Sequence, residues 1–131
     1  MTGLSGSNTI ANSTITLNSA TNGIGSTGNG VGQGGGIFRD ARALALRSTI
    51  VAQNVATGFG HDVLDSGGGV TAGFNLIGNG EFSGVTAAGN NQVGTSGAPI
   101  DPELGPLQDN GGPTPTRMPN ADSPLCSGRS V

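Results

Sequence analysis

A short string that recurs after about 35 residues is the feature that most constrains the fold of this chain. Residues 12–20 read Asn-Ser-Thr-Ile-Thr-Leu-Asn-Ser-Ala, and residues 47–56 read Arg-Ser-Thr-Ile-Val-Ala-Gln-Asn-Val-Ala, with one residue inserted before the asparagine. An apolar strand that returns at a regular spacing is typical of proteins whose repeats stack on one another. We therefore predict an all-β fold, a right-handed parallel β-helix of about four to five rungs with roughly 20–25 residues each.

The alternation of apolar and polar residues predicts where the strands lie and which side chains face inward. Strands are expected at residues 37–38, 43–46, 49–52, 62–64 and 74–78, and weaker ones within 82–93, because β-branched and aliphatic residues there are bounded by Gly, Asn and Ser. A bend is expected near Ser48, and Asn54 is expected at a turn, where asparagine side chains of successive rungs can hydrogen-bond. The predicted inward-facing residues are Ile10, Ile15, Leu17, Leu44, Leu46 and Ile50, with Phe38 and Phe74 as further core residues.

The composition supports a many-turned β protein. The chain has 26 Gly among 131 residues, no Trp or Tyr, and only 10% charged residues. Disordered chains rarely carry β-branched residues at the short, regular intervals seen here. A globule of this size needs larger side chains to form a core, whereas a solenoid buries small residues in layers.

Two segments depart from the repeat. Residues 18–33, within the rung region 1–97, are rich in Gly, Asn, Ser and Thr, and we expect a loop there. All seven prolines lie in residues 98–131. Proline lacks the N–H that a sheet requires, so we expect this tail to be an irregular cap that follows the last rung.

Charge and hydropathy exclude several partners. The net charge is −3 and the five cationic residues, all Arg, form no basic stripe, so nucleic acid is not expected as a partner. No apolar run reaches the roughly 18 residues of a membrane span, and no signal peptide is visible. We expect Met1 to mark a truncation of a longer exported protein, and we expect the open end rungs to form a homo-oligomer. Cys126 is the sole cysteine, so no disulfide is predicted.

The densest group of ionisable residues is His61-Asp62-Val63-Leu64-Asp65, which glycines flank on both sides. If the protein is an enzyme, His61 is the candidate base, and Asp62 and Asp65 are a candidate carboxylate pair for glycoside cleavage. The alternative is that these are turn residues, and adjacent His61 and Asp62 are expected on opposite faces of a strand. A second candidate face, for a polysaccharide lyase, contains Arg39, Asp40, Arg42 and Arg47; otherwise these residues keep the surface soluble, with the arginines pairing with Asp40.

No cofactor or metal is predicted. Residues 23–28 spell G-x-G-x-x-G, but neither the strand before it nor the helix after it that a dinucleotide site needs is present. Residues 34–40 have the glycines of a calcium-binding β-roll, but Asp40 comes too late and the motif does not repeat. One His and one Cys at distant positions do not make a zinc site. Sugar stacking would have to use Phe59 and Phe82, since Trp and Tyr are absent.

Residues 101–116, Asp-Pro-Glu-Leu-Gly-Pro-Leu-Gln-Asp-Asn-Gly-Gly-Pro-Thr-Pro-Thr, resemble the closing motif of bacterial right-handed parallel β-helix repeat proteins of the choice-of-anchor Q type. Upstream strings agree, among them residues 12–15, 34–37, 48–50, 62–63 and 75–78. Beyond residue 116 the sequence has drifted from the usual ending, and the anchor is missing. The resemblance implies a segment of a large secreted or cell-surface bacterial protein and no established reaction. We therefore expect a non-catalytic structural or adhesive segment that contacts a polysaccharide or another surface ligand. The alternative is a carbohydrate-active or ester hydrolase, because related β-helices include such enzymes.

Overall fold

The computed structural model describes residues 6–126, and within them the chain is all β, with thirteen strands and no helix. It divides into two compact units, Met1–Ile100 and Asp101–Val131. The predicted all-β class is confirmed. In the described part of the chain no helix is long and apolar enough to cross a membrane.

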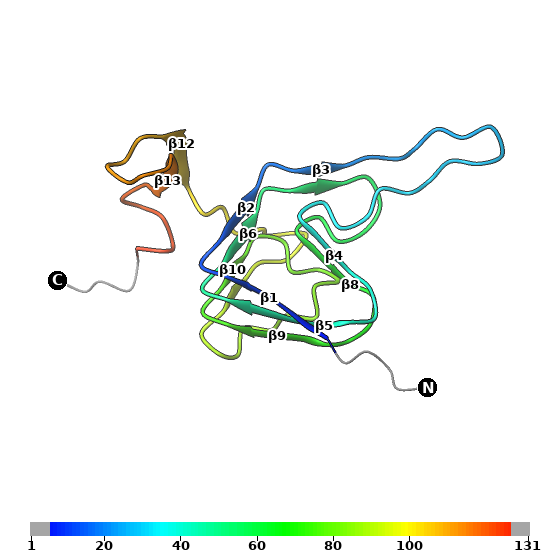
Figure 1. Cartoon of the computed structure of the whole chain (residues 1–131), viewed down its shortest axis with the longest axis horizontal. Helices are drawn as coiled ribbons and strands as arrows, with labels where there is room; N and C mark the ends of the chain where they lie inside the picture. The colour runs from blue at the N-terminus through cyan, green and yellow to red at the C-terminus, as the bar shows by residue number, and fades with distance from the viewer. Residues whose placement is uncertain (1–5, 127–131) are drawn as a thin grey trace. The chain divides into compact units, whose positions relative to one another are not determined.

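The first unit contains four parallel sheets (Figure 1). One contains β1 (Ser7–Ala11), β5 (Ala43–Arg47) and β9 (Val70–Gly73), and the longest contains β2 (Thr14–Thr16), β6 (Ile50–Ala52), β10 (Leu76–Ile77) and β11 (Gln92–Val93). Two smaller sheets pair β3 (Ser19–Ala20) with β7 (Val55–Ala56), and β4 (Ile37–Arg39) with β8 (Val63–Asp65).

The chain passes through these sheets in a fixed order. β1, β2, β3 and β4 are each followed, in the same order, by their partners β5, β6, β7 and β8. We call one such pass a level. The separation in sequence between residues that stack on successive levels is 36 residues from Asn18 to Asn54, 26 from Thr49 to Asn75 and 16 from Asn75 to Asn91. The levels therefore shorten along the chain, instead of having the uniform 20–25 residues expected.

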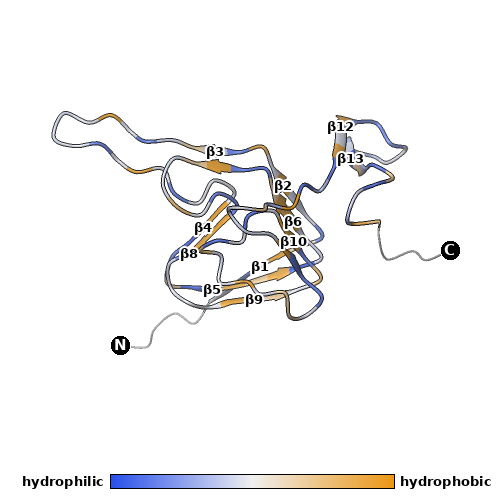
Figure 2. Ribbon diagram, turned by 180° about the vertical axis from the view of Figure 1, so that it is seen from behind, coloured by the Kyte–Doolittle hydropathy of each residue, from blue (hydrophilic) through white to orange (hydrophobic). Residues whose placement is uncertain are grey.

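The core of this unit lies between the sheets and consists of aliphatic residues stacked level upon level. Leu46, Val51, Val63 and Ile77 are fully buried, and Ile10, Ile15 and Ile37 pack against them at one end. The apolar residues follow the strands in Figure 2. The prediction of Leu44 and Leu46 as core residues is confirmed, but the core residue of β6 is Val51, whereas Ile50 is only partly buried.

Left-handed backbone at the corners explains the displaced core residue. Ser48 has φ 49°, as part of a stacked column in which Asn12, Phe74 and Asn90 also have positive φ. Such a residue interrupts the strict alternation of side chains, so Val51 follows Leu46 into the core. The bend at Ser48 is therefore confirmed, but the parity predicted across it was wrong.

Three further core predictions were wrong for related reasons. Leu17 has φ 60° at a corner and is exposed. Phe74, also at a corner, is 69% exposed, and Phe38 on β4 is exposed between the partly buried Ile37 and the buried Arg39. Hydrophobicity alone predicted these residues to be inside, but their backbone conformation or strand parity directs them to solvent.

The range predicted as a loop, 18–33, contains strand β3, and residues 21–33 after it form no strand. The base of the loop is closed by Gly32 N–H, which donates to Asn22 Oδ1 at 3.0 Å. It is tied to the second level by Gly58 N–H, which donates to the Gly32 carbonyl at 2.8 Å. The rest extends away from the sheets as a long arm (Figure 1). Ile24 on this arm is 96% exposed.

The second unit differs from the irregular tail that was expected. β12 (Leu104–Gln108) and β13 (Thr116–Pro119) form an antiparallel pair, with the register shifting between Leu104 and Leu107. Pro106 falls at this shift and Pro119 at the end of β13, which are positions where a missing N–H is tolerated. The buried Ser123 hydroxyl donates to the Pro102 carbonyl at 2.7 Å within the same unit.

Candidate functional site

The three residues predicted as a candidate site, His61, Asp62 and Asp65, lie in and just before β8. Each is hydrogen-bonded to a different part of the chain, and within residues 6–126 no hydrogen bond or ion pair joins any two of them. The three residues are close in sequence, but the structure does not join them into one catalytic site.

Asp62 is 2% exposed and is an acceptor within the fold. Its Oδ1 accepts the backbone N–H and the side-chain Nδ2–H of Asn54, both at 2.9 Å, and its Oδ2 accepts the backbone N–H of Asn79 at 2.6 Å. These bonds connect β8 to the corner after β6 and to the segment after β10. A carboxylate enclosed in this way holds three segments together and is out of reach of a polymeric substrate.

Close backbone packing surrounds the Asp62 carboxylate. A Cβ at Gly78 would lie 2.8 Å from Asp62 Oδ2 and 2.9 Å from the Ala52 Cβ, and a Cβ at Gly36 would lie 2.6 Å from the Asp62 carbonyl oxygen. Only glycine fits at such approaches. Two of the chain's many glycines are thus explained by the buried aspartate.

Asp65 pairs with Arg39, its register partner on β4. Burial alone would raise the pKa of Asp65, but hydrogen bonds from Arg39 and from the amides of Gly67 and Gly68, with the positive charge of Arg39, outweigh it. The pKa consequently lies below its ordinary value. Asp65 is an ionised structural partner, which is the opposite of the protonated carboxyl that a glycosidase acid requires.

His61 is half-buried, and its Nδ1 accepts the backbone N–H of Ala56 at 3.3 Å. An Nδ1 that accepts this hydrogen bond carries no proton of its own. This hydrogen bond holds the His61 ring against the end of β7, and Nδ1 is therefore not available as a base.

The second predicted face, with its four charged residues, is divided by the structure. Arg39 is buried, with its Nε donating to the Arg42 carbonyl and its guanidinium paired with Asp65, so the expected pairing with Asp40 is wrong for this residue. Arg39, Asp40 and Arg42 nevertheless line one pocket, of about 360 Å³, beside Ile10 and Leu44, so only Arg47 is separated from the predicted face.

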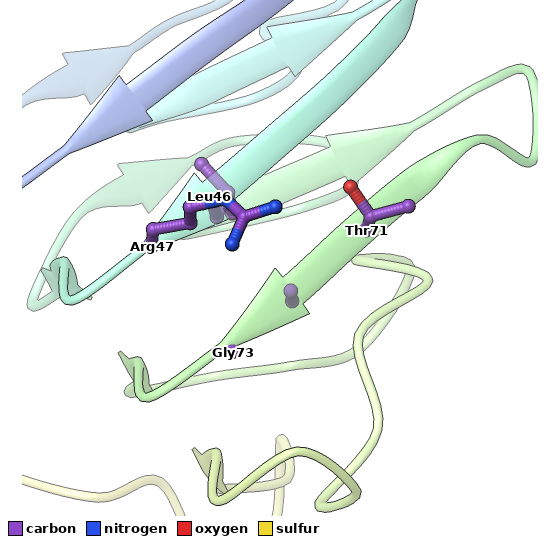
Figure 3. A pocket seen from close by; sticks show the side chains of 5 residues that line it. Leu46, Arg47, Thr71 and Gly73 are labelled. Carbon is purple, nitrogen blue, oxygen red and sulfur yellow. The ribbon is translucent and has the colours of Figure 1, made fainter.

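Arg47 belongs to a different pocket, of about 110 Å³. Figure 3 shows its side chain extending over the sheet from β5 towards Thr71 on the neighbouring β9. Gly73, the register partner of Arg47, leaves the space beside it open. A single arginine beside a threonine supplies a cation and a hydroxyl but no base and no second charged group for catalysis.

Two asparagine ladders are the polar feature that the sequence predicted only in part. Asn54 Oδ1 accepts both the backbone N–H and the Nδ2–H of Asn18 at 3.0 Å, which confirms the stacking expected at Asn54. A second ladder, at the neighbouring corner, has Asn91 Oδ1 accepting the N–H and Nδ2–H of Asn75 at 3.0 and 2.9 Å. The sequence did contain a signal for two corners. The same number of residues separates Thr49 from Asn54 as separates Ser13 from Asn18, so a polar residue recurs at each of the two corners on both levels.

Phe59 and Phe82 form an edge-to-face pair with ring centroids 5.3 Å apart, and both are about half exposed. This is the ordinary geometry of two packed aromatic rings. Within residues 6–126 no group of three His, Cys, Asp or Glu side chains is placed to hold a metal ion. Searches for a matching family model, a matching curated protein and a matching solved structure each found none.

Proposed function

We propose that this chain is a non-catalytic structural or adhesive segment of a bacterial secreted or cell-surface protein, built as a right-handed parallel β-helix. The observation that carries this proposal is the use of Asp62. The residue that a hydrolase would need as an acid or base is buried and accepts three hydrogen bonds from Asn54 and Asn79.

The parallel β-helix is favoured by the strand pairing. Four sheets visited in a fixed order, with every pairing in the first unit parallel, are the arrangement that a coiled chain produces. Right-handedness follows from the strong preference of parallel crossover connections for that hand. The surface assignment rests on the resemblance of residues 101–116 to the closing motif of bacterial repeat proteins. In this chain that motif spans β12 and the turn that leads to β13.

The alternative, a carbohydrate-active or ester hydrolase, is tested directly. The purified chain is assayed on a panel of polysaccharides and simple esters, together with His61→Ala and Asp62→Asn. We expect no turnover by any of the three. Turnover that is lost in either variant, while circular dichroism shows the fold retained, would overturn the non-catalytic proposal.

Adhesion is tested by binding of the intact chain to immobilised polysaccharides. Phe59→Ser with Phe82→Ser removes the exposed aromatic pair, and Phe38→Ser is the matched control because Phe38 is an equally exposed ring outside the pair, on β4. Binding that falls with the pair and not with the control supports a polysaccharide ligand. Absence of binding to every polysaccharide removes the adhesive half of the proposal and leaves the structural half.

A further inference from the structure

Four asparagines of this chain are followed directly by glycine, and the structure holds them in different ways. They are Asn22, Asn29, Asn79 and Asn110. An asparagine before glycine is especially prone to lose its side-chain ammonia, because glycine has no Cβ to keep its backbone nitrogen away from the asparagine side chain. The surroundings of each asparagine then decide which of the four reacts in the folded chain.

Asn79 is half-buried and is held by its neighbours on several sides. Its N–H donates to Asp62 Oδ2 at 2.6 Å, and its Oδ1 accepts the N–H of Glu81 at 3.1 Å. The N–H of Gly80, whose nitrogen would have to attack Asn79, donates to the Gly94 carbonyl at 3.0 Å. This last bond joins two stacked levels, so a reaction here requires the levels to separate, which has a high free-energy cost.

Two further asparagines are held through their side chains. Asn22 Oδ1 accepts the N–H of Gly32 at 3.0 Å and the hydroxyl of Thr57 at 2.5 Å. Asn110 lies between β12 and β13, and its Nδ2 donates to the carbonyl and the hydroxyl of Thr116 at 2.9 and 3.0 Å. In each case two hydrogen bonds must break before Cγ can turn towards the nitrogen of the following glycine.

Asn29 differs from these three residues. It is exposed on the arm formed by residues 23–31, which extends away from the sheets (Figure 1). Its side chain makes no hydrogen bond to any residue that the structure describes. The nitrogen of Gly30 makes one hydrogen bond, to the Gly23 carbonyl at 3.0 Å on the same arm. A backbone hydrogen bond on an exposed segment without buried contacts opens at little cost.

We propose that Asn29 is a site of spontaneous deamidation, at which the folded chain converts this asparagine into aspartate and isoaspartate. The nitrogen of Gly30 gives its proton to hydroxide and attacks Cγ of Asn29. The new N–Cγ bond replaces the Cγ–Nδ2 bond, and Nδ2 leaves as ammonia with a proton from water. One water molecule then opens the succinimide ring, and attack at Cγ gives aspartate, whereas attack at the backbone carbonyl carbon gives isoaspartate.

The reaction changes the chemistry of the arm. Residues 21–33 contain no charged side chain, so either product places a carboxylate where the sequence has none. Isoaspartate also lengthens the backbone by one carbon atom, because the chain then passes through the former side chain. The reaction needs only the arm and water, and it is independent of the function proposed above.

The test follows all four asparagines at once. The full chain is incubated at about pH 8, folded or in concentrated urea, in water enriched in the heavy isotope of oxygen. Peptide mapping by mass spectrometry detects the isotope that ring opening incorporates, and isoaspartyl methyltransferase detects the isoaspartate. We expect Asn29 to convert about ten-fold or more faster than the other three in the folded chain. In urea all four rates should agree within about three-fold, and the rate at Asn29 should match its folded rate to the same extent.

Gly30→Ala tests the attacking nitrogen. A Cβ at Gly30 would lie 3.7 Å from the nearest atom beyond its chain neighbours, and a Cβ at Gly23 would meet nothing within 4 Å, so both positions accept alanine. We expect Gly30→Ala to slow conversion at Asn29 about ten-fold, because the added Cβ hinders the attack. Gly23→Ala is the matched control and should leave conversion at Asn29 unchanged.

Three outcomes would overturn the proposal. The first is conversion at another of the four asparagines that equals conversion at Asn29 while circular dichroism shows the chain folded. The second is an Asn29 rate that is about ten-fold or more lower in the folded chain than in urea. The third is conversion at Asn29 that Gly30→Ala does not slow.

Discussion

Asn54 receives two hydrogen bonds from Asn18 through one oxygen atom, from the backbone N–H and from the side-chain Nδ2–H, each at 3.0 Å. Its own N–H and Nδ2–H donate to Asp62 Oδ1. A polar chain therefore runs from Asn18 through Asn54 to a buried carboxylate. Because none of the buried side-chain nitrogen and oxygen atoms in the described residues lacks a hydrogen-bond partner, this chain holds adjacent levels in register without an uncompensated buried group.

The two asparagines should be energetically coupled. Asn54→Ala leaves the Asn18 N–H without its acceptor and leaves Asp62 Oδ1 with only the backbone N–H of residue 54, so we expect a loss of about 2–3 kcal/mol in unfolding free energy. Asn18→Ala, at the exposed end of the ladder, should cost about 1 kcal/mol. A double-mutant cycle from urea titrations should give a coupling of about 1 kcal/mol, and additive effects would show that the ladder is not cooperative.

Asp62→Ala should be more damaging than the loss of an ordinary surface aspartate. It removes the acceptor for three N–H groups around a closely packed site, and we expect a cost of about 3 kcal/mol or more. Asp122→Ala, at an exposed position in the second unit, is the matched control and should change unfolding free energy by less than about 0.5 kcal/mol. Equal effects of the two substitutions would contradict the structural role assigned to Asp62.

The ion pair between Asp65 and Arg39 predicts a dependence of stability on pH. Because folding lowers the pKa of Asp65 from its ordinary value of 3.8, this carboxylate stabilises the fold above that value. The stabilisation is lost as the pH falls through the lower folded-state pKa. Urea unfolding of the wild type and of Asp65→Asn, measured from about pH 7 down to about pH 2.5, should show a difference that is constant above about pH 5 and shrinks below about pH 4. A difference that is the same at every pH would rule out this contribution.

Phe74 is a strained residue that contributes little packing. Its φ is 59°, and its side chain is largely exposed. Left-handed backbone costs most L-residues about 1–2 kcal/mol, and Asn tolerates it better. We expect Phe74→Asn to raise unfolding free energy by about 0.5–1 kcal/mol, measured by thermal or urea unfolding. Phe38→Asn is the control, because Phe38 lies in a strand without positive φ, and a gain of stability there as well would exclude relief of backbone strain as the cause.

The sequence repeat predicted the parallel pairing but misplaced it by one residue. Aligning the two Ser-Thr-Ile strings sets Ile15 beside Ile50, whereas the structure pairs Ile15 with Val51 and keeps the offset of 36 that joins Asn18 to Asn54. The asparagine was the better guide to register, because its side chain must meet a particular amide, whereas Ile and Val can exchange places in a core at little cost.

The candidate site was less predictable than the strands. The separation of His61 from Asp62 was expected from strand alternation, and the structural role of Asp62 agrees in outline with its alternative reading as a turn residue. Its burial was not predictable, since it depends on Asn79 and Gly78, residues of the next level that approach it only in three dimensions. Arg39 was misassigned for the same reason, because its partner Asp65 lies 26 residues away.

The successive offsets of 36, 26 and 16 residues show that the stacked strands keep their register while the connecting segments change length greatly. Insertions and deletions of about ten residues can therefore accumulate at one corner without disturbing the buried columns. The arm that carries Ile24 is the largest such addition. A foreign peptide could be displayed in its place, between two strands whose positions are held by their neighbours and not by the loop that joins them.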